Sequence, residues 1–295
     1  MKQLIFAALA ACVLPMTACS VLIASDFDNT LIYTEGAMRR GDAIPPLPES
    51  NRAALEYFMA EGGRFAITTG RALPAMLRFL DQVPTNAPGI MCNGAALYDF
   101  EKGAYQELVM LDEEALARGQ AMLDLFPELA VEAYYIGNTI YSVHANEVTK
   151  KHVRLTQVET AAKASLTEVP LPVGKLLFEA EHETLEKVFA ELEQRGWAEN
   201  YELIYTAPEL LEMTIKGASK GNMVRTLAEK LGISMEHVYC VGDQGNDLSM
   251  LAVAATGFAP ANCSEAVRAS GATIVADARE GALADVIRIL DEKYA

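Results

Sequence analysis

The chain has 295 residues, of which 51% are hydrophobic and 22% charged, a composition that excludes a disordered protein and leaves material for more than one buried core. Its formal net charge of −16, without a Lys/Arg-rich run, excludes a protein that grips the phosphate backbone of nucleic acids, because such proteins need a basic face. The five cysteines form no CxxC and no paired spacing with histidine, so we expect reduced packing residues rather than a cysteine-based zinc site or a disulfide framework.

Residues 1–20 allow three interpretations. The segment MKQLIFAALAACVLPMTAC has one lysine, an apolar run and small residues before Cys19, which is the layout of a secretory or lipoprotein signal. A lipid on Cys19 would leave almost no tether before the first strand, and Met16 is an alternative true start. Pro15 interrupts the apolar run and so disfavours a spanning helix. We expect a cytoplasmic protein, with export or a lipid anchor at Cys19, and hence membrane association, as the alternative.

Beyond residue 20, strand and helix patterns alternate. The apolar run VLIASD predicts a buried strand at 21–26, and a loop rich in Gly and Pro follows at 36–48. A helix is expected at 49–63, with Ser50 or Asn51 as its N-cap. A strand at 64–70, a helix at 71–83 and a further strand at 89–99 complete the first part. This order is typical of a parallel sheet with helices on both faces.

The middle of the chain changes character. Hairpins are expected about residues 137–138 and about Pro208, where antiparallel pairs replace the parallel pattern, and helix patterns occur at 112–126 and 182–197. We therefore predict an inserted α/β cap domain at 99–211 and a core formed by 21–98 plus 212–295. In the second part of the core we expect helices at 219–232, 246–255 and 281–294, and strands at 237–243 and 272–277.

Two carboxylates end the first strand, in the stretch IASDFDNTL. Residues two apart on a strand share a face, so Asp26 and Asp28 can converge just beyond its carboxyl end, the edge where open parallel sheets bind ligands. Adjacent carboxylates repel unless a cation lies between them or one is protonated, and Mg²⁺ prefers oxygen ligands of this kind. Taken alone, the pattern also fits a pair of turn or helix-capping aspartates.

Other strand ends supply matching groups. A hydroxyl and backbone amides after the second strand can hold an anionic oxygen, further carboxylates end the strand at 237–243, and Lys220 opens a helix where the helix dipole disfavours a cation. Each residue alone also fits a turn, a cap or a solvated surface. The groups concerned are Thr68, Thr69, Arg71, Lys220, Asp243, Asn246 and Asp247.

The motifs DFDNT, TTGR, SKG and GDQGND, in this order, resemble the four signatures of the haloacid dehalogenase superfamily. CNGAALYD and APANCSEAVRASGATIVADAREGAL support a resemblance to its Cof-like phosphatase branch, which covers residue 21 to the C-terminus. The fold it implies is an α/β protein with a Rossmann-like parallel-sheet core and an inserted α/β cap. The activity it implies is a Mg²⁺-dependent phosphatase.

The resemblance also implies a role for each residue. Asp26 would be the nucleophile that forms an aspartyl-phosphate, and Asp28 the general acid and then the base. Lys220 would bind the transferring phosphoryl and offset negative charge. The implied metal ligands are Asp26, Asp28 through its backbone carbonyl, Asp243 and Asp247, and the implied phosphate-side and substrate-side residues are Thr69, Gly70, Arg71, Asn93 and Asn246.

Some assignments leave alternatives open. Asn29 stands where family members usually have glycine, and asparagine tolerates the left-handed backbone that such a turn needs. Thr68 is the fallback for Thr69, and Lys216 is a weaker candidate for the lysine role. Arg71 has an ion pair to the loop aspartates as its alternative. Asn93 has a plain strand-to-turn role as its alternative.

We expect a phosphomonoesterase that acts on a small phosphorylated metabolite such as a sugar phosphate, under a cap that limits bulk water. A phosphomannomutase-like phosphotransferase is the first alternative, since it would return the phosphate to a sugar. A catalytically silent binding module is the second, and Asn29 is the one feature in its favour.

Overall fold

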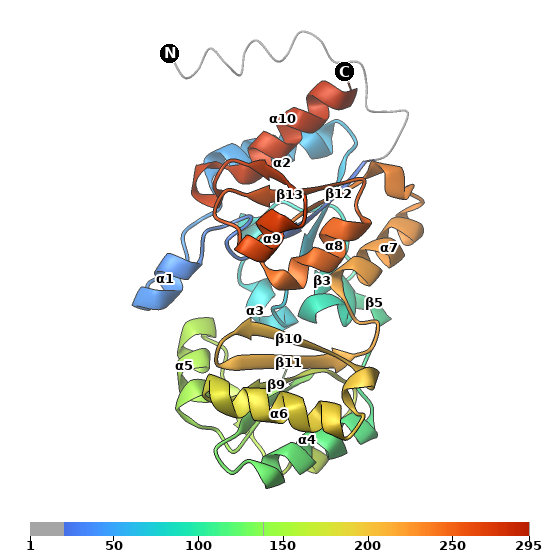
Figure 1. The fold of residues 1–295 in the computed structure, drawn as a ribbon. Coiled ribbons are helices and arrows are strands. Elements are labelled where there is room, and N and C mark those ends of the chain that lie inside the picture. Colours follow the sequence, from blue (N-terminus) through green and yellow to red (C-terminus); the bar gives the residue numbers. More distant parts are fainter. Residues whose placement is uncertain (1–20, 138, 295) are drawn as a thin grey trace.

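The computed structural model describes residues 21–137 and 139–294, and the expectation for residues 1–20 lies outside them. Two sheets organise the chain. The larger has the strand order β14-β13-β12-β1-β2-β3-β4-β5, and the smaller β10-β11-β9-β6-β7-β8. Figure 1 shows them in two bodies, with the core above and the inserted cap below.

The core sheet is parallel from β14 to β3 and antiparallel from β3 to β5. β1 lies at its centre between β12 and β2 and is buried along its whole length, as its apolar run predicts. The strands are β1 (Leu22–Asp26), β2 (Arg64–Thr68), β3 (Gly89–Met91), β4 (Ala96–Asp99), β5 (Ala104–Leu108), β12 (Val238–Val241), β13 (Thr256–Pro260) and β14 (Thr273–Val275).

Helices cover both faces of this sheet, as expected (Figure 1). α2 and α10 pack together on one face, and α7 and α8 on the other. The expected strands and helices of residues 219–294 are present as β12, β14, α7, α8 and α10. The core helices are α1 (Glu35–Arg40), α2 (Glu49–Ala60), α3 (Leu73–Leu77), α7 (Lys220–Leu231), α8 (Leu248–Val253), α9 (Glu265–Ala269) and α10 (Ala282–Tyr294).

The cap sheet places its α4 and α6 helices on the side away from the core, so its other face looks toward the core (Figure 1). Both expected hairpins are confirmed as the antiparallel pairs β6–β7 and β10–β11. Its elements are α4 (Glu113–Leu125), β6 (Ala130–Tyr135), β7 (Thr139–Val143), α5 (Glu147–Thr156), β8 (Thr160–Ala162), β9 (Val173–Glu179), α6 (His182–Gln194), β10 (Tyr201–Ala207) and β11 (Leu210–Ile215).

Several expectations need correction. The segment 89–99 is a hairpin rather than one strand, because Cys92, Asn93 and Gly94 all have positive φ and reverse the chain between β3 and β4. β5 pairs with the core sheet and β11 with the cap sheet, so the boundaries fall near residues 109 and 216 instead of 99 and 211. The expected loop at 36–48 is helical in its first part, as α1. The sequence prediction also missed α5, α9, β5, β8, β9 and β13.

The N-cap of α2 is Pro48 rather than Ser50 or Asn51. The buried Asn51 side chain instead donates to Leu31 O and accepts from the Ala284 backbone N–H, which ties α2 to the loop after β1 and to α10. Cys92, Cys240 and Cys263 are free thiols. Within residues 21–137 and 139–294, no helix is long and apolar enough to cross a membrane.

Candidate active site

Asp26 lies buried at the carboxyl end of β1, where a lysine holds it. Lys220, fully buried in the first turn of α7, donates from Nζ to Asp26 Oδ1 over 2.5 Å and to Asp247 Oδ1 over 2.6 Å. Burial disfavours its ammonium ion, yet Asp247 and Asp26 together raise the pKa of Lys220. Burial raises the pKa of Asp26, and the charge of Lys220 opposes that rise. Lys220 is therefore a fixed positive charge between two carboxylates.

Asp26, Asp243 and Asp247 offer carboxylate oxygens that all lie within 4.8 Å of one another. Asp247 Oδ2 accepts the backbone N–H groups of Asp243 and Gln244 over 2.9 and 3.0 Å. Asp243 Oδ1 accepts from Thr30 Oγ1 over 2.9 Å, whereas its buried Oδ2 has no hydrogen-bond partner among the described residues. Burial, followed by the charge of Asp247, raises the pKa of Asp243 to about 7. An orphaned carboxylate oxygen in an all-oxygen cluster fits Mg²⁺.

Asp28 is held away from this cluster by an ion pair. Arg71 donates from Nε to Asp28 Oδ2 over 2.7 Å and from a terminal nitrogen to Oδ1 over 2.6 Å, and Thr34 Oγ1 donates to Oδ1 over 2.7 Å. Burial opposes ionisation, but Arg71 holds the pKa of Asp28 below its usual value. The Arg71 guanidinium also lies 5.3 Å from the ring centres of Phe27 and Phe79. The ion pair left open as the alternative for Arg71 is thus present, and Asp28 is ionised in this state.

Asn29 shapes the turn that carries Asp28. Its φ is 58°, in the left-handed region where asparagine is among the better tolerated side chains. Its Oδ1 accepts the backbone N–H groups of Thr34 and Glu35 over 3.2 and 2.9 Å, at the start of α1. A glycine would adopt the same φ but would leave these two N–H groups without that acceptor. The Asn29 backbone therefore turns the chain after Asp28, and its side chain ties this turn to the start of α1.

The loop after β2 presents Thr69, which is fully buried. Its Oγ1 accepts the backbone N–H of Arg71 over 3.0 Å, and a Cβ at Gly70 would come within 3.1 Å of the Asn93 side chain. Thr68 Oγ1 instead points to Met250 Sδ of α8 at 3.4 Å. These contacts favour Thr69 over Thr68 as the hydroxyl of the loop, and they place Asn93 directly beside it.

Asn93 connects the core to the cap. Asn246 Nδ2 donates to Asn93 Oδ1 over 3.0 Å, and Asn93 Nδ2 donates to Glu212 Oε2 of β11 over 2.6 Å. Lys175 of β9 donates to Glu212 Oε1 over 2.7 Å and to the Gly70 carbonyl oxygen over 3.1 Å. A continuous polar chain thus runs from the start of the 3₁₀ turn Gly245–Asp247 to two buried charges of the cap sheet. The closed cap touches both loops of the site.

A sequence model of the haloacid dehalogenase-like hydrolases matches residues 23–287. The chain belongs to the haloacid dehalogenase-like hydrolases. This match spans both the core and the inserted cap, as the expected Cof-like branch requires. The expected α/β core with a parallel sheet agrees with it, and the chain is an enzyme, a hydrolase of the phosphatase type.

Relatives of this haloacid dehalogenase-like hydrolase cover most of its length. YxeH of Bacillus subtilis (strain 168), provisionally named a phosphatase, is 30% identical over 249 residues, covering 82% of this chain and 87% of the relative. The pyridoxal phosphate phosphatase YbhA of Escherichia coli (strain K12) is 27% identical over 282 residues, covering 90% and 97%. Both proteins are similar to this chain, and the substrate in a relative's name is that relative's substrate.

Solved structures show the same fold. A haloacid dehalogenase-like hydrolase from Bacteroides thetaiotaomicron superposes with a TM-score of 0.78 at 23% identity, covering 92% of this chain and 99% of that one. BT4131, described as a subclass IIB sugar phosphatase, superposes with a TM-score of 0.76 at 22% identity, also covering 92% and 99%. At these identities the likeness concerns the fold of this hydrolase.

Glu212 and Lys175 are the site residues that sequence reasoning missed. Their side chains are only 8% and 4% exposed, although each interrupts an apolar strand, LLEMTI and VGKLLFE. Charged residues are rarely buried unless they are paired, so a lysine and a glutamate inside such strands are a usable signal. The sequence does not indicate that this face of the cap lies against Thr69 and Asn93 of the core.

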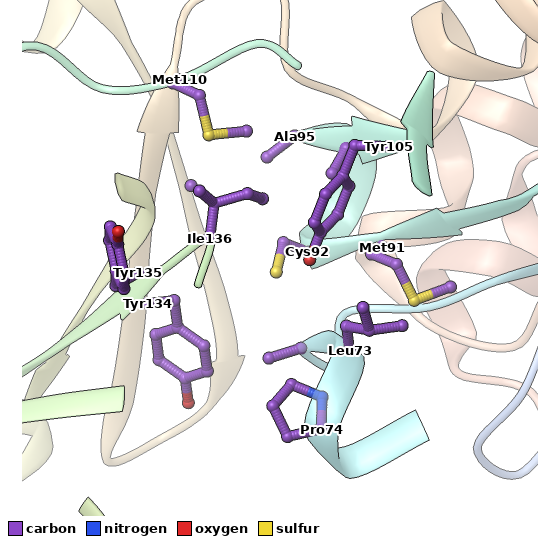
Figure 2. A pocket seen from close by; sticks show the side chains of 13 residues that line it. Leu73, Pro74, Met91, Cys92, Ala95, Tyr105, Met110, Tyr134, Tyr135 and Ile136 are labelled. Carbon is purple, nitrogen blue, oxygen red and sulfur yellow. The ribbon is translucent and has the colours of Figure 1, made fainter. Parts of the chain in front are cut away.

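A hollow lies beside this polar chain at the junction of core and cap (Figure 2). None of the clustered aspartates lines it. Tyr134 does, and its hydroxyl donates to Glu132 over 2.8 Å while Lys175 Nζ lies 4.3 Å from its ring centre. Tyr135 also lines the hollow, whereas His144 is exposed. The remaining walls are mostly apolar: Ala72, Leu73, Pro74, Met91, Cys92, Ala95, Ala96, Tyr105, Met110, Ile136 and Gly174.

Proposed function

We propose that this hydrolase is a Mg²⁺-dependent phosphomonoesterase that works through an aspartyl-phosphate on Asp26 and acts on a small phosphorylated metabolite of the sugar-phosphate class. The observation that carries the proposal is the buried cluster of Asp26, Asp243 and Asp247 around Lys220, with one carboxylate oxygen left unpartnered. An anionic phosphate needs positive charge at this place, and Lys220 is a fixed source of it.

Asp26 would attack phosphorus through a carboxylate oxygen, so that a P–O bond to Asp26 forms and the P–O bond to the leaving alkoxide breaks. The Thr69 hydroxyl and Lys220 would bind the transferring phosphoryl oxygens. Asp26, Asp243 and Asp247, with the backbone carbonyl of Asp28, would hold Mg²⁺, which neutralises charge on phosphate oxygens when bound. Water would then attack the aspartyl-phosphate and release inorganic phosphate.

Asp28 would give its proton to the leaving alkoxide and then take a proton from the attacking water. In the ion pair with Arg71 it is a carboxylate, which suits the second of these steps. For the first step, substrate must loosen the ion pair so that Asp28 can carry a proton. We therefore expect the Arg71 contact to change when substrate binds.

The cap residues support a polyhydroxylated substrate. Lys175, Glu212 and Asn93 provide adjacent donors and acceptors above the phosphate loop, and hydroxyl groups both donate and accept hydrogen bonds. The three side chains are buried against one another in the closed state, so a substrate would replace some of their mutual contacts.

The test is release of inorganic phosphate by the full chain from a panel of sugar phosphates, nucleotides, pyridoxal phosphate and para-nitrophenyl phosphate, with Mg²⁺ or with chelator. We expect release only with Mg²⁺, and a loss of about 10⁴-fold or more in Asp26→Asn, as for removal of a nucleophile. Asp42→Asn is the matched control, because the Asp42 side chain is 54% exposed and pairs with nearby Arg40.

Release that persists in Asp26→Asn would refute the aspartyl-phosphate. Transfer of phosphate between sugar positions without net release would favour the mutase instead. Binding of Mg²⁺ with no turnover on any member of the panel would favour the silent module.

A further inference from the structure

A second cluster of metal-ligating side chains lies in the cap, apart from the aspartate cluster. Glu132 of β6 and Glu179 of β9 share one face of the sheet as diagonal neighbours, since Glu132 pairs with Leu177 and Glu179 with Ala130. His152 of α5 reaches down between them. Glu132 Oε2 lies 3.1 Å and Glu179 Oε1 3.3 Å from His152 Nδ1, and all three ligand atoms fall within 4.8 Å of one another.

Charge and hydrogen bonding at this cluster do not balance. The Glu132 and Glu179 side chains are 2% and 0% exposed. A ring nitrogen carries one hydrogen at most, so the single N–H of His152 Nδ1 can be directed at one of the two carboxylate oxygens but not at both. Glu179 Oε1 accordingly has no hydrogen-bond partner within the described part of the chain. Burial raises the pKa of Glu179, which shows that its charge is incompletely compensated here. A fully buried carboxyl oxygen aimed at a shared point, without a donor, is suited to bind a cation.

In the part of the chain that the structure describes, the ion pairs bring no further cation to this place. Among the ion pairs of residues 21–137 and 139–294, none joins a lysine or an arginine to Glu132 or Glu179. The nearby Lys175 is engaged by Glu212 and by the Gly70 carbonyl. Burial lowers the pKa of His152, but its contacts with Glu132 and Glu179 outweigh this and raise it to about 9, so in the absence of a metal ion one proton serves two carboxylates.

The donor set identifies the class of ion. One imidazole nitrogen with two carboxylate oxygens suits zinc and similar divalent transition ions, whereas Mg²⁺ and Ca²⁺ prefer oxygen alone. With metal–ligand bonds of about 2.0 Å, ligand atoms of a tetrahedral site lie about 3.3 Å apart, close to the two separations measured here. Oriented partners are also present, because Tyr134 donates to Glu132 and Thr149 Oγ1 donates to Glu179 Oε2.

We propose that Glu132, His152 and Glu179 form a binding site for a zinc-class divalent ion in the cap, distinct from the aspartate cluster of the core. The ion would join α5 to β6 and β9 through three ligands and leave a position for water. The His152 side chain is 15% exposed, which provides the approach from solvent. Tyr134, bonded to Glu132, also lines the hollow beside the site, so the ion would help to fix the cap surface that faces the core.

The test is titration of chelator-treated full chain with Zn²⁺, followed by calorimetry, in excess Mg²⁺ so that the core cluster is occupied. We expect one tight equivalent in wild type and a loss of at least about 100-fold in affinity in His152→Gln. His182→Gln is the matched control, because His182 is 50% exposed and lies near Glu186 one helical turn away. That variant and Asp243→Asn should bind Zn²⁺ as wild type does.

Absence of a tight equivalent in wild type, or its survival in His152→Gln, would overturn the proposal. So would its loss in Asp243→Asn, since the ion would then belong to the core. Should His152→Gln fail to fold, Glu179→Gln takes its place. X-ray absorption of the zinc-loaded wild type tests the site without any variant: imidazole nitrogen and oxygen ligands are expected, and a sulfur ligand or no imidazole would refute the site.

Discussion

Lys220→Met is the substitution that most directly tests how the core site is held together. Methionine keeps an unbranched side chain, one atom shorter than that of lysine, but removes the charge that lies between Asp26 and Asp247. Because the Lys220 side chain is fully buried, no water can replace the two hydrogen bonds, and two carboxylates remain together without a cation. The variant should therefore be less stable than wild type in the absence of metal ions.

The magnitude follows from burial. Removing one partner of a buried ion pair costs about 3–5 kcal/mol, whereas an exposed pair contributes about 0–1 kcal/mol. The cost should depend on pH. Without Lys220, the pKa of Asp26 rises further above its unfolded value, so its neutral form stabilises the fold at low pH and this stabilisation is lost as pH rises through the folded pKa. The deficit should be larger at pH 8 than at pH 5.

The assay is urea unfolding in chelator at both pH values, with a signal that reports unfolding of the core domain. Lys216→Met is the matched control, since Lys216 is 60% exposed and lies 3.5 Å from Glu202, so its loss should cost less than about 1 kcal/mol. Added Mg²⁺ should return part of the stability of Lys220→Met by supplying positive charge. Equal stability of the two variants at pH 8 would refute the view of Lys220 as a structural counter-ion.

Three further results are expected. Asn29→Ala should lower the free energy of unfolding by about 1–3 kcal/mol, because alanine keeps the left-handed strain and loses the side-chain acceptor. Asn29→Gly should lower it less, and equal losses of the two variants in thermal unfolding would contradict this. Arg71→Met should let the pKa of Asp28 rise, so the basic limb of the pH profile of kcat/KM, which reports the acid of the first step, should move to higher pH, and an unchanged profile would speak against Asp28 as that acid. Asp243→Asn should raise the Mg²⁺ concentration for half-maximal activity by at least about tenfold, and an unaltered Mg²⁺ requirement would remove Asp243 from the ligand set.

The core site is predictable from the sequence because a parallel sheet brings the carboxyl ends of its strands to one edge. Asp26 ends β1 and Asp243 follows β12, and these strands are neighbours in the sheet. Lys220 is recognisable as a cation placed against the dipole of its own helix, and the structure pairs it with Asp26 and Asp247. Alternation of strands and helices brings these residues to one edge, and the resemblance suggests their roles.

The partner of Asp28 is harder to predict. In the sequence, Arg71 fits a contact to substrate or an ion pair equally well, since a guanidinium near a phosphate loop serves either purpose. Local sequence cannot choose, because Asp28 and Arg71 meet only through the turn that Asn29 makes and through stacking of Arg71 on Phe27 and Phe79. The choice depends on tertiary contacts that periodicity does not report.

Domain boundaries are hard to predict for a related reason. A strand pattern states which faces of a strand are apolar but not which sheet it will join. The segment 104–108 has an exposed, polar pattern, and it nevertheless extends the core sheet by pairing with β4. The segment 210–215 is buried and apolar like a core strand, yet it lies between β10 and β9 of the cap.

Hydrogen bonds join the cap to two loops of the proposed core site. Glu212 accepts from Asn93, which in turn accepts from Asn246 next to Asp247, while Lys175 holds the carbonyl of Gly70 next to Thr69. Opening the cap would therefore take an acceptor from Asn93 and a donor from Gly70 at the same time. Gly70 is the neighbour of Thr69, which is proposed to bind phosphate. Asn93 accepts from Asn246, the neighbour of Asp247, which is proposed to bind the metal ion. On the proposed roles, a substrate that contacts Lys175 or Glu212 would act on the loop of Thr69 and on Asn246 beside Asp247. Binding far from phosphorus would then affect the position of the groups proposed to meet the phosphate.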